Sequence, residues 1–92
     1  MLPIFWRPAA LGDLLAITSY IAESNPVAAR RIKELIETSV LPAAEHPYIF
    51  RPGRVPGTRE IVAHPNYIVV YQVAGDRIDV IAVVHTRRAF PS

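Results

Sequence analysis

The densest run of apolar residues lies near the C-terminus, between positions 67 and 85. Residues 67–73 read Tyr-Ile-Val-Val-Tyr-Gln-Val, and residues 78–85 read Ile-Asp-Val-Ile-Ala-Val-Val-His. Both segments are rich in the β-branched and aromatic side chains that fit a pleated strand. Gly75 and Asp76 between them give the backbone freedom that a tight turn needs. The pattern therefore predicts an antiparallel hairpin.

Neither strand of this hairpin alternates cleanly between apolar and polar positions, so both of its faces need cover. Alternation places Ile68 and Val70 on one face of the first strand, and it places Ile81 and Val83 together on one face of the second. A chain of 92 residues buries only about 60–65% of its unfolded surface, so we expect one apolar face to be left for another polypeptide. These four residues are the candidate contacts of that partner.

Upstream of the hairpin, apolar residues recur at steps of three and four, which is typical of helices. The first predicted helix begins at Ala9 and ends near Ser24. Its apolar stripe holds Leu11, Leu14, Leu15, Ile17 and Ile21. The second begins at the capping pair Asn25-Pro26 and ends near Ala44, with Pro42 expected to kink or end its last turn. Its inner stripe holds Ala28, Ile32, Leu35, Ile36, Ser39 and Val40. Because the connection is short, the helices should form an antiparallel hairpin that covers one face of the sheet.

Two further strands complete the predicted order β, α, α, β, β, β. Residues 3–7 predict an edge strand because prolines bound them, and residues 58–63 predict another strand after an irregular stretch rich in proline and glycine. We therefore expect one α+β domain over residues 1–92, with the helical hairpin packed on a mainly antiparallel four-stranded sheet.

Composition narrows the class of protein. Hydrophobic residues make up 51% of the chain and charged residues 20%, which is typical of a folded globular protein. The absence of cysteine excludes disulfides and thiolate chemistry and agrees with a cytoplasmic protein. No basic segment precedes an apolar run at the N-terminus, so we expect neither a signal peptide nor a membrane partner.

The ten cationic side chains comprise nine arginines and Lys33, against eight carboxylates. Arginine suits bidentate contacts to phosphate or carboxylate, so the bias favours an anionic partner, although genome composition gives the same bias. Arg51 and Arg54 in the irregular stretch, together with Arg88 near the C-terminus, are the candidate residues for binding a nucleic acid or another target.

Candidate chemistry centres on His85, His64, Arg87 and Arg59. Acid–base catalysis needs a proton donor and a proton acceptor, and a developing negative charge needs cationic stabilisation. The two histidines are predicted at one end of the sheet. A loop position also explains His64, a structural hydrogen bond explains His85, and a carboxylate partner explains Arg59. The histidines lack metal-ligand spacing, so we expect no metal and no cofactor.

Several segments, taken in order, resemble the RelE/ParE toxins of bacterial toxin–antitoxin modules. They are Asp13-Leu14, Tyr20-Ile21-Ala22, Asn25-Pro26, residues 51–60 (Arg-Pro-Gly-Arg-Val-Pro-Gly-Thr-Arg-Glu), residues 67–71 and residues 84–88 (Val-His-Thr-Arg-Arg). The resemblance implies the same βααβββ fold and a toxin encoded beside an antitoxin, whose C-terminal segment wraps it to form a hetero-oligomer.

The family resemblance implies two different targets, because RelE-type members cut mRNA in the ribosome whereas ParE-type members poison DNA gyrase on the same scaffold. Arg87 stands where a C-terminal catalytic arginine is expected, but Ala63 or Ile68 stands where another arginine falls. Residues 85–87 (His-Thr-Arg) also fit the ParE-type ending. The arginine and histidine content favours mRNA cleavage as the sequence-based hypothesis, with gyrase poisoning and a non-toxic antitoxin-binding domain as alternatives.

Overall fold

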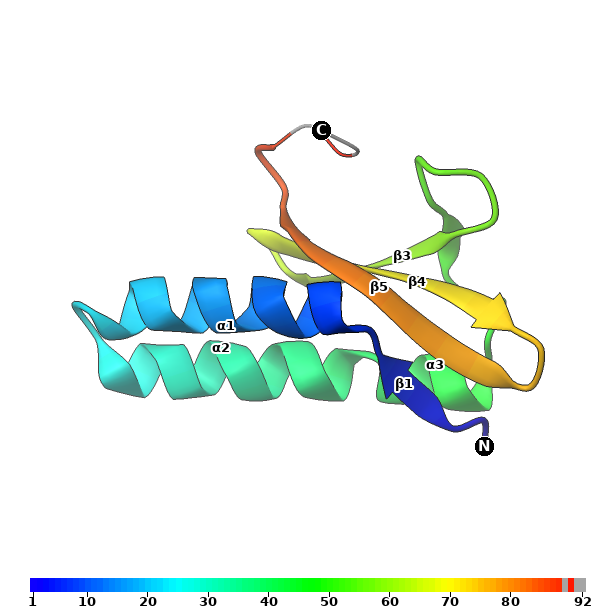
Figure 1. Cartoon of the computed structure of the whole chain (residues 1–92), viewed down its shortest axis with the longest axis horizontal. Helices are drawn as coiled ribbons and strands as arrows, with labels where there is room; N and C mark the ends of the chain where they lie inside the picture. The colour runs from blue at the N-terminus through cyan, green and yellow to red at the C-terminus, as the bar shows by residue number, and fades with distance from the viewer. Residues whose placement is uncertain (89, 91–92) are drawn as a thin grey trace.

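The computed structural model describes residues 1–88 and 90, which form two layers, a helical layer and a sheet (Figure 1). The elements are β1 (Ile4–Trp6), α1 (Pro8–Ala22), α2 (Pro26–Ser39), α3 (Leu41–Glu45), β2 (Arg51–Pro52), β3 (Arg59–His64), β4 (Tyr67–Ala74) and β5 (Arg77–His85). Ala89, Pro91 and Ser92 lie outside the described residues.

The sheet has the strand order β1-β5-β4-β3-β2. β1 pairs parallel with β5, and the other pairs are antiparallel. The predicted α+β class, with a helical hairpin on a mainly antiparallel sheet, is therefore confirmed. The short elements α3 and β2 are additions to the predicted order, and β2 makes the sheet five-stranded.

The helical hairpin forms as the sequence predicts. Asn25 begins α2 by accepting the Ala28 N–H on its side-chain Oδ1 at 3.0 Å. The second predicted helix breaks at Val40, and α3 continues in its place. Pro42 explains this break, because it has no N–H for the Thr38 carbonyl and its ring crowds that oxygen.

The main core lies between the helices and the sheet. Its largest member is Tyr71, which is fully buried and donates its hydroxyl hydrogen to the Pro47 carbonyl at 2.6 Å. α1 turns Ala10 and Leu14 into this core. Leu11 and Leu15, predicted to share the inner stripe, are instead 52% and 66% exposed. Both side chains lie on the side of α1 that faces away from the sheet. The stripe of α1 that is buried against the sheet is therefore narrower than the stripe of apolar residues in its sequence.

A β-bulge corrects the predicted faces of β5. Val70 pairs with Ala82 and Tyr71 pairs with Val80, so Ile81 is an extra residue in β5. Past the bulge the alternation is inverted. Val83, predicted on the same face as Ile81, is therefore buried in the helix-facing core, whereas Ile81 packs on the outer face beside Ala82.

The outer face of the sheet, turned away from the helices, is better covered than predicted. Ile68 and Val70 are only 4% and 0% exposed, so the expectation of a bare apolar surface at these two residues is wrong. They form a small cluster with Ala82, against which Phe90 and neighbouring side chains pack. On α1, by contrast, Leu11, Leu15 and Tyr20 are more than half exposed.

Candidate functional site

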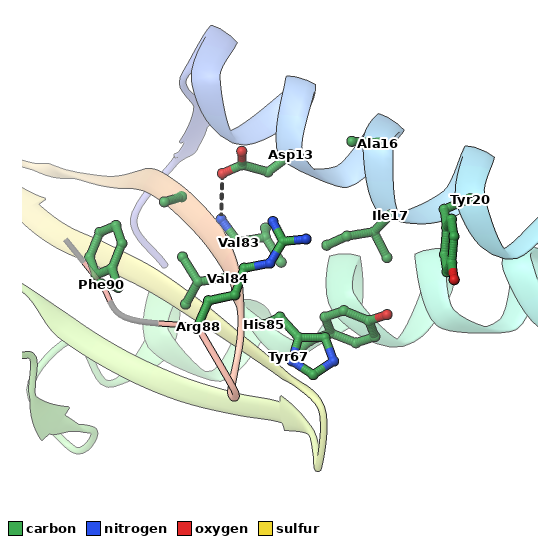
Figure 2. A pocket seen from close by; sticks show the side chains of 11 residues that line it. Asp13, Ala16, Ile17, Tyr20, Tyr67, Val83, Val84, His85, Arg88 and Phe90 are labelled. Atoms are coloured by element: carbon green, nitrogen blue, oxygen red, sulfur yellow. Dashed lines mark hydrogen bonds between the residues drawn. The ribbon is translucent and has the colours of Figure 1, made fainter. Parts of the chain in front are cut away.

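A groove with a cavity of about 500 Å³ lies between α1 and the ends of the central strands (Figure 2). α1 supplies Asp13, Ala16, Ile17 and Tyr20, β4 supplies Tyr67, β5 supplies residues 82–85, and the C-terminal segment supplies Arg88 and Phe90. The groove thus has an apolar floor, aromatic side chains at its walls and a cation at its edge.

The edge of β5 forms part of this groove. β1 pairs only with residues 78–80 of β5, so within the described residues the rest of that edge has no neighbouring strand. Asp13 reaches across from α1, and its Oδ2 accepts the Val83 N–H at 2.9 Å (Figure 2). The carboxylate of Asp13 therefore accepts a backbone hydrogen bond that a carbonyl of a neighbouring strand would otherwise accept.

The solvent-facing side of α1, hereafter the apolar side of α1, adjoins the groove. It is made by the exposed residues Ala9, Leu11, Gly12, Leu15, Ala16, Ser19 and Tyr20. None of them is charged, and Asp13, the one charged residue of α1, is turned to Val83. The exposed side of α2, by contrast, carries Arg30, Arg31, Lys33, Glu34 and Glu37. The two helices therefore present different chemistry to solvent.

His64 and His85 lie at one end of the sheet, as predicted, with Tyr67 between them. The Tyr67 ring centroid is 5.8 Å from that of His64 and 5.3 Å from that of His85. Nδ1 of His64 accepts the Asn66 N–H at 3.0 Å, and Nδ1 of His85 accepts the Arg87 N–H at 3.1 Å. Each imidazole therefore keeps only Nε2 for proton transfer.

Arg59 does not join this histidine pair. Its guanidinium donates to the carbonyls of Tyr48 and Phe50 at 3.2 and 2.7 Å and lies 5.1 Å from the centre of the Tyr48 ring. Arg59 begins β3 and His64 ends it, so about 17 Å of strand separates them. The structure uses Arg59 to hold the loop that precedes β2.

Arg51 and Arg54 surround Glu60 on the outer face. Arg51 Nη2 lies 3.3 Å from Oε1, and Oε2 receives the Arg54 Nε at 3.2 Å and the Arg54 backbone N–H at 2.9 Å. Glu60 is only 4% exposed. Burial by itself raises the pKa of Glu60, but the Arg54 N–H and the two guanidinium groups outweigh it and hold this pKa below its ordinary value of 4.5.

A second cluster, which the sequence analysis missed, surrounds Asp79. Arg7 Nη2 donates to Oδ2 at 3.1 Å, and Arg77 Nε lies 2.8 Å from Oδ1 in an ion pair without hydrogen-bond alignment. The Arg77 guanidinium also lies 5.0 Å from the centre of the Phe5 ring. Burial opposes ionisation of Asp79, yet the two arginines hold its pKa below 3.8. The only signal in the sequence was an aspartate inside an otherwise apolar strand, which needs a cationic partner.

Arg87 and Arg88 follow β5 and are exposed. Arg88 lines the groove, and Arg87 contacts His85 through its backbone. Across residues 1–88 and 90, no group of three or more histidine, cysteine, aspartate or glutamate side chains is placed to hold a metal ion. In the same residues, no helix has the length and apolar character that a membrane crossing requires.

Known proteins resemble this chain along nearly its whole length. The sequence model of the family described as "ParE toxin of type II toxin-antitoxin system, parDE" matches residues 4–90. A protein of Sinorhizobium fredii, provisionally named toxin Y4kP, is 38% identical over 96% of this chain and 92% of its own length. Toxin RelE2 of Caulobacter vibrioides is 33% identical over 96% of this chain and 99% of its own length.

Solved structures share the fold. One chain from the chromosomal ParDE system of P. aeruginosa superposes with a TM-score of 0.81 and 24% identity, covering 92% of this chain and 96% of that one. A toxin from Helicobacter pylori superposes with a TM-score of 0.67 and 13% identity, covering 98% of this chain and all of that one (100%). At these identities the two structures establish the architecture alone.

Proposed function

We propose a function on one premise: the chain belongs to the ParE toxin family of type II toxin–antitoxin systems. It is the toxin component of such a system, and a cognate antitoxin is its partner. On that premise it inhibits growth in the cytoplasm by poisoning DNA gyrase, and a segment of the antitoxin neutralises it within a hetero-oligomer.

The groove and the apolar side of α1 are the proposed antitoxin surface. Leu15 and Tyr20 are 66% and 75% exposed in the free chain, and covering them removes apolar area from water. The groove beside them accepts anchoring apolar side chains, while Arg88 at its edge favours a carboxylate of the partner. Ile81, predicted from the sequence as an antitoxin contact, is half-buried on the outer face and lies outside this proposed surface.

The position of Arg59 supports gyrase poisoning over RNA cleavage. A nuclease needs cations aimed at the scissile phosphate. Arg59 donates instead to two loop carbonyls, about 17 Å of strand away from His64. Two of the predicted catalytic residues are therefore separated by the length of β3, and a toxin that acts by binding does not need them together.

Ribosome-dependent mRNA cleavage is the second candidate, because one observation favours it. His64, His85 and the backbone of Arg87 lie at the same end of the sheet, and Nε2 of each imidazole is free of the contacts described above. An acid and a base on either side of Tyr67 suit proton transfer.

Induction of the toxin without its antitoxin, followed by separate pulse labelling of new DNA and new protein, distinguishes the two targets. We expect DNA synthesis to stop first and purified gyrase to accumulate linear DNA when the toxin is added. The variant His64→Gln/His85→Gln, which keeps hydrogen-bond acceptors, should stay toxic. Early arrest of translation with cut message, abolished in this variant, would establish the nuclease instead. Unhindered growth would contradict both and leave a non-toxic binding domain.

A further inference from the structure

Charge is divided unevenly between the two layers. From the start of α1 to the end of α3, residues 8–45 carry five carboxylates and three cationic side chains. The remaining residues carry seven arginines against three carboxylates. The modest net charge of +2 therefore conceals a negative helical layer and a strongly positive sheet layer.

Two of those three carboxylates are Glu60 and Asp79, and both lie on the outer face. Glu60 is opposite Val70, a member of the outer cluster, and Asp79 lies between Ile78 and Val80, which both face the helices. Each is almost fully buried at 4% and 2% exposure. Each is therefore held beneath the arginines that contact it.

The four arginines of these clusters are held in place but remain open to solvent. The side chains of Arg7, Arg51, Arg54 and Arg77 are between 40% and 58% exposed. A guanidinium has five N–H donors, and each of these four contacts its carboxylate through a single nitrogen. One carboxylate among two guanidinium groups also leaves each cluster with a net positive charge. Fixed, planar cations with spare donors suit a phosphodiester, and little side-chain entropy is left to lose.

The spacing of the clusters fits a polymer rather than a single small anion. Glu60 of β3 pairs with Val70 of β4, and Asp79 of β5 pairs with Gln72 of β4. The two carboxylates are therefore two strands apart across the sheet and two residues apart along it. A rise of about 3.3 Å per residue and a strand separation of about 4.8 Å place the two clusters about 12 Å apart. One phosphate cannot bridge that distance.

We propose that these two clusters are phosphate clamps that hold the backbone of a nucleic acid across the outer face of the sheet. The proposal extends the proposed function, on which it rests for the identity of the polymer: DNA held by gyrase, or RNA as the other source of the same phosphodiester. It adds Arg7 and Arg77 to the target-binding arginines expected from the sequence.

The test measures binding of the purified toxin, without gyrase or ribosomes, to a fluorescein-labelled DNA duplex and to a labelled single-stranded RNA of equal length. Fluorescence anisotropy is recorded over a series of salt concentrations. The variant Arg51→Gln/Arg77→Gln removes one arginine from each clamp and leaves each buried carboxylate with its other partner. The matched control Arg30→Gln/Arg31→Gln removes the same charge from exposed positions of α2.

We expect the clamp variant to bind at least about tenfold more weakly and to reduce the slope of log K against log salt by about 1.8 for duplex DNA, since each lost phosphate contact contributes about 0.9. The α2 control should stay within about twofold of the parent chain. Thermal unfolding of both variants shows whether either has lost its fold. If the clamp variant unfolds, the variant Arg51→Lys/Arg77→Lys is measured in its place. Because lysine keeps the charge but cannot form bidentate contacts, this variant should keep the salt slope and bind more weakly.

Two outcomes would overturn the proposal: equal losses in the clamp variant and the α2 control, or no binding of the parent chain to either polymer. None of these measurements uses gyrase, so they test the clamps independently of the proposed function. If the chain poisons gyrase but does not bind nucleic acid, the clamp proposal is wrong and the proposed function stands. Clamp-dependent binding to RNA but not to duplex DNA would keep the clamps and contradict gyrase as the target.

Discussion

The apolar side of α1 and the arginines on the outer face of the sheet are both exposed, yet the two surfaces are built from opposite chemistry. The exposed residues of α1 include leucines, alanines and a tyrosine and no charged side chain. The outer face carries two buried carboxylates, each surrounded by two half-exposed arginines. Burial of the apolar side of α1 is favourable because it removes apolar area from water. Contact with an anion is favourable for the arginines of the outer face because it forms charge-assisted hydrogen bonds.

This difference indicates two kinds of ligand. An apolar helix face with an adjoining groove fits a protein segment, whereas ordered arginines fit a polyanion. Neutralisation by the antitoxin and recognition of the target would then use separate surfaces of one small domain. The following changes test that separation, from the largest expected effect to the smallest.

Leu15→Arg places a charge in the middle of the apolar side of α1. We expect the affinity for the cognate antitoxin to fall at least about 100-fold, or about 2.7 kcal/mol, because the new charge must be desolvated at the interface. Isothermal titration calorimetry measures this change. Leu35→Arg is the matched control, since Leu35 of α2, predicted on the inner stripe of that helix, is instead 41% exposed. Equal losses in both variants would show that the chemistry of α1 does not define the antitoxin surface.

Asp13 tests whether the one charge of α1 is structural. Asp13→Ala removes the acceptor of the Val83 N–H and should lower the free energy of unfolding by about 1–2 kcal/mol. Asp13→Asn keeps an acceptor oxygen and should recover most of that loss. Urea unfolding measures both variants. An asparagine variant as unstable as the alanine variant would mean that the negative charge itself matters.

The carboxylates of the outer face should make stability fall in acid. The pKa values of Glu60 and Asp79 are lowered on folding, so the unfolded chain binds more protons than the folded chain in acid. Their contribution is complete above about pH 4.5, the ordinary pKa of glutamate, and is lost as the pH falls through the folded values. Urea unfolding between pH 6 and pH 3 follows this loss. Glu60→Gln should flatten the profile, and an unchanged profile would show that the Glu60 contacts are not those of an ionised group.

Gly12→Ala probes the apolar side of α1 with the smallest change. A Cβ at Gly12 meets nothing within 4 Å, and Gly12 lies inside a helix. Alanine should therefore raise the free energy of unfolding by about 0.5–1 kcal/mol through its higher helix propensity. Thermal unfolding of the free toxin checks this. A lower stability would indicate that this side of α1 already packs against another molecule in solution.

Much of the fold could be predicted from the sequence because it depends on local signals. Asn25-Pro26 fixes the start of α2, and Gly75, with a φ of +63°, turns the chain between β4 and β5. The bulge at Ile81 could not be predicted, because its neighbours are all apolar and give no marker for a change of face. The buried position of Val83 follows only from that bulge.

The site divides in the same way. The two histidines could be placed together because each lies at a strand end. The contact between Arg7 and Asp79 spans 72 positions of sequence and depends on the parallel pairing of β1 with β5, which no local pattern specifies. Arg59 was assigned to chemistry because its contacts with the loop were invisible in the sequence.

The most direct test of two separate surfaces is a paired titration of the same two variants with both ligands. Leu15→Arg and Arg51→Gln/Arg77→Gln would each be titrated with the cognate antitoxin and with the labelled DNA duplex. The account predicts that the first variant loses antitoxin affinity and keeps DNA affinity within about twofold, and that the second does the reverse. A parallel loss of both affinities in either variant, with its fold intact, would contradict it.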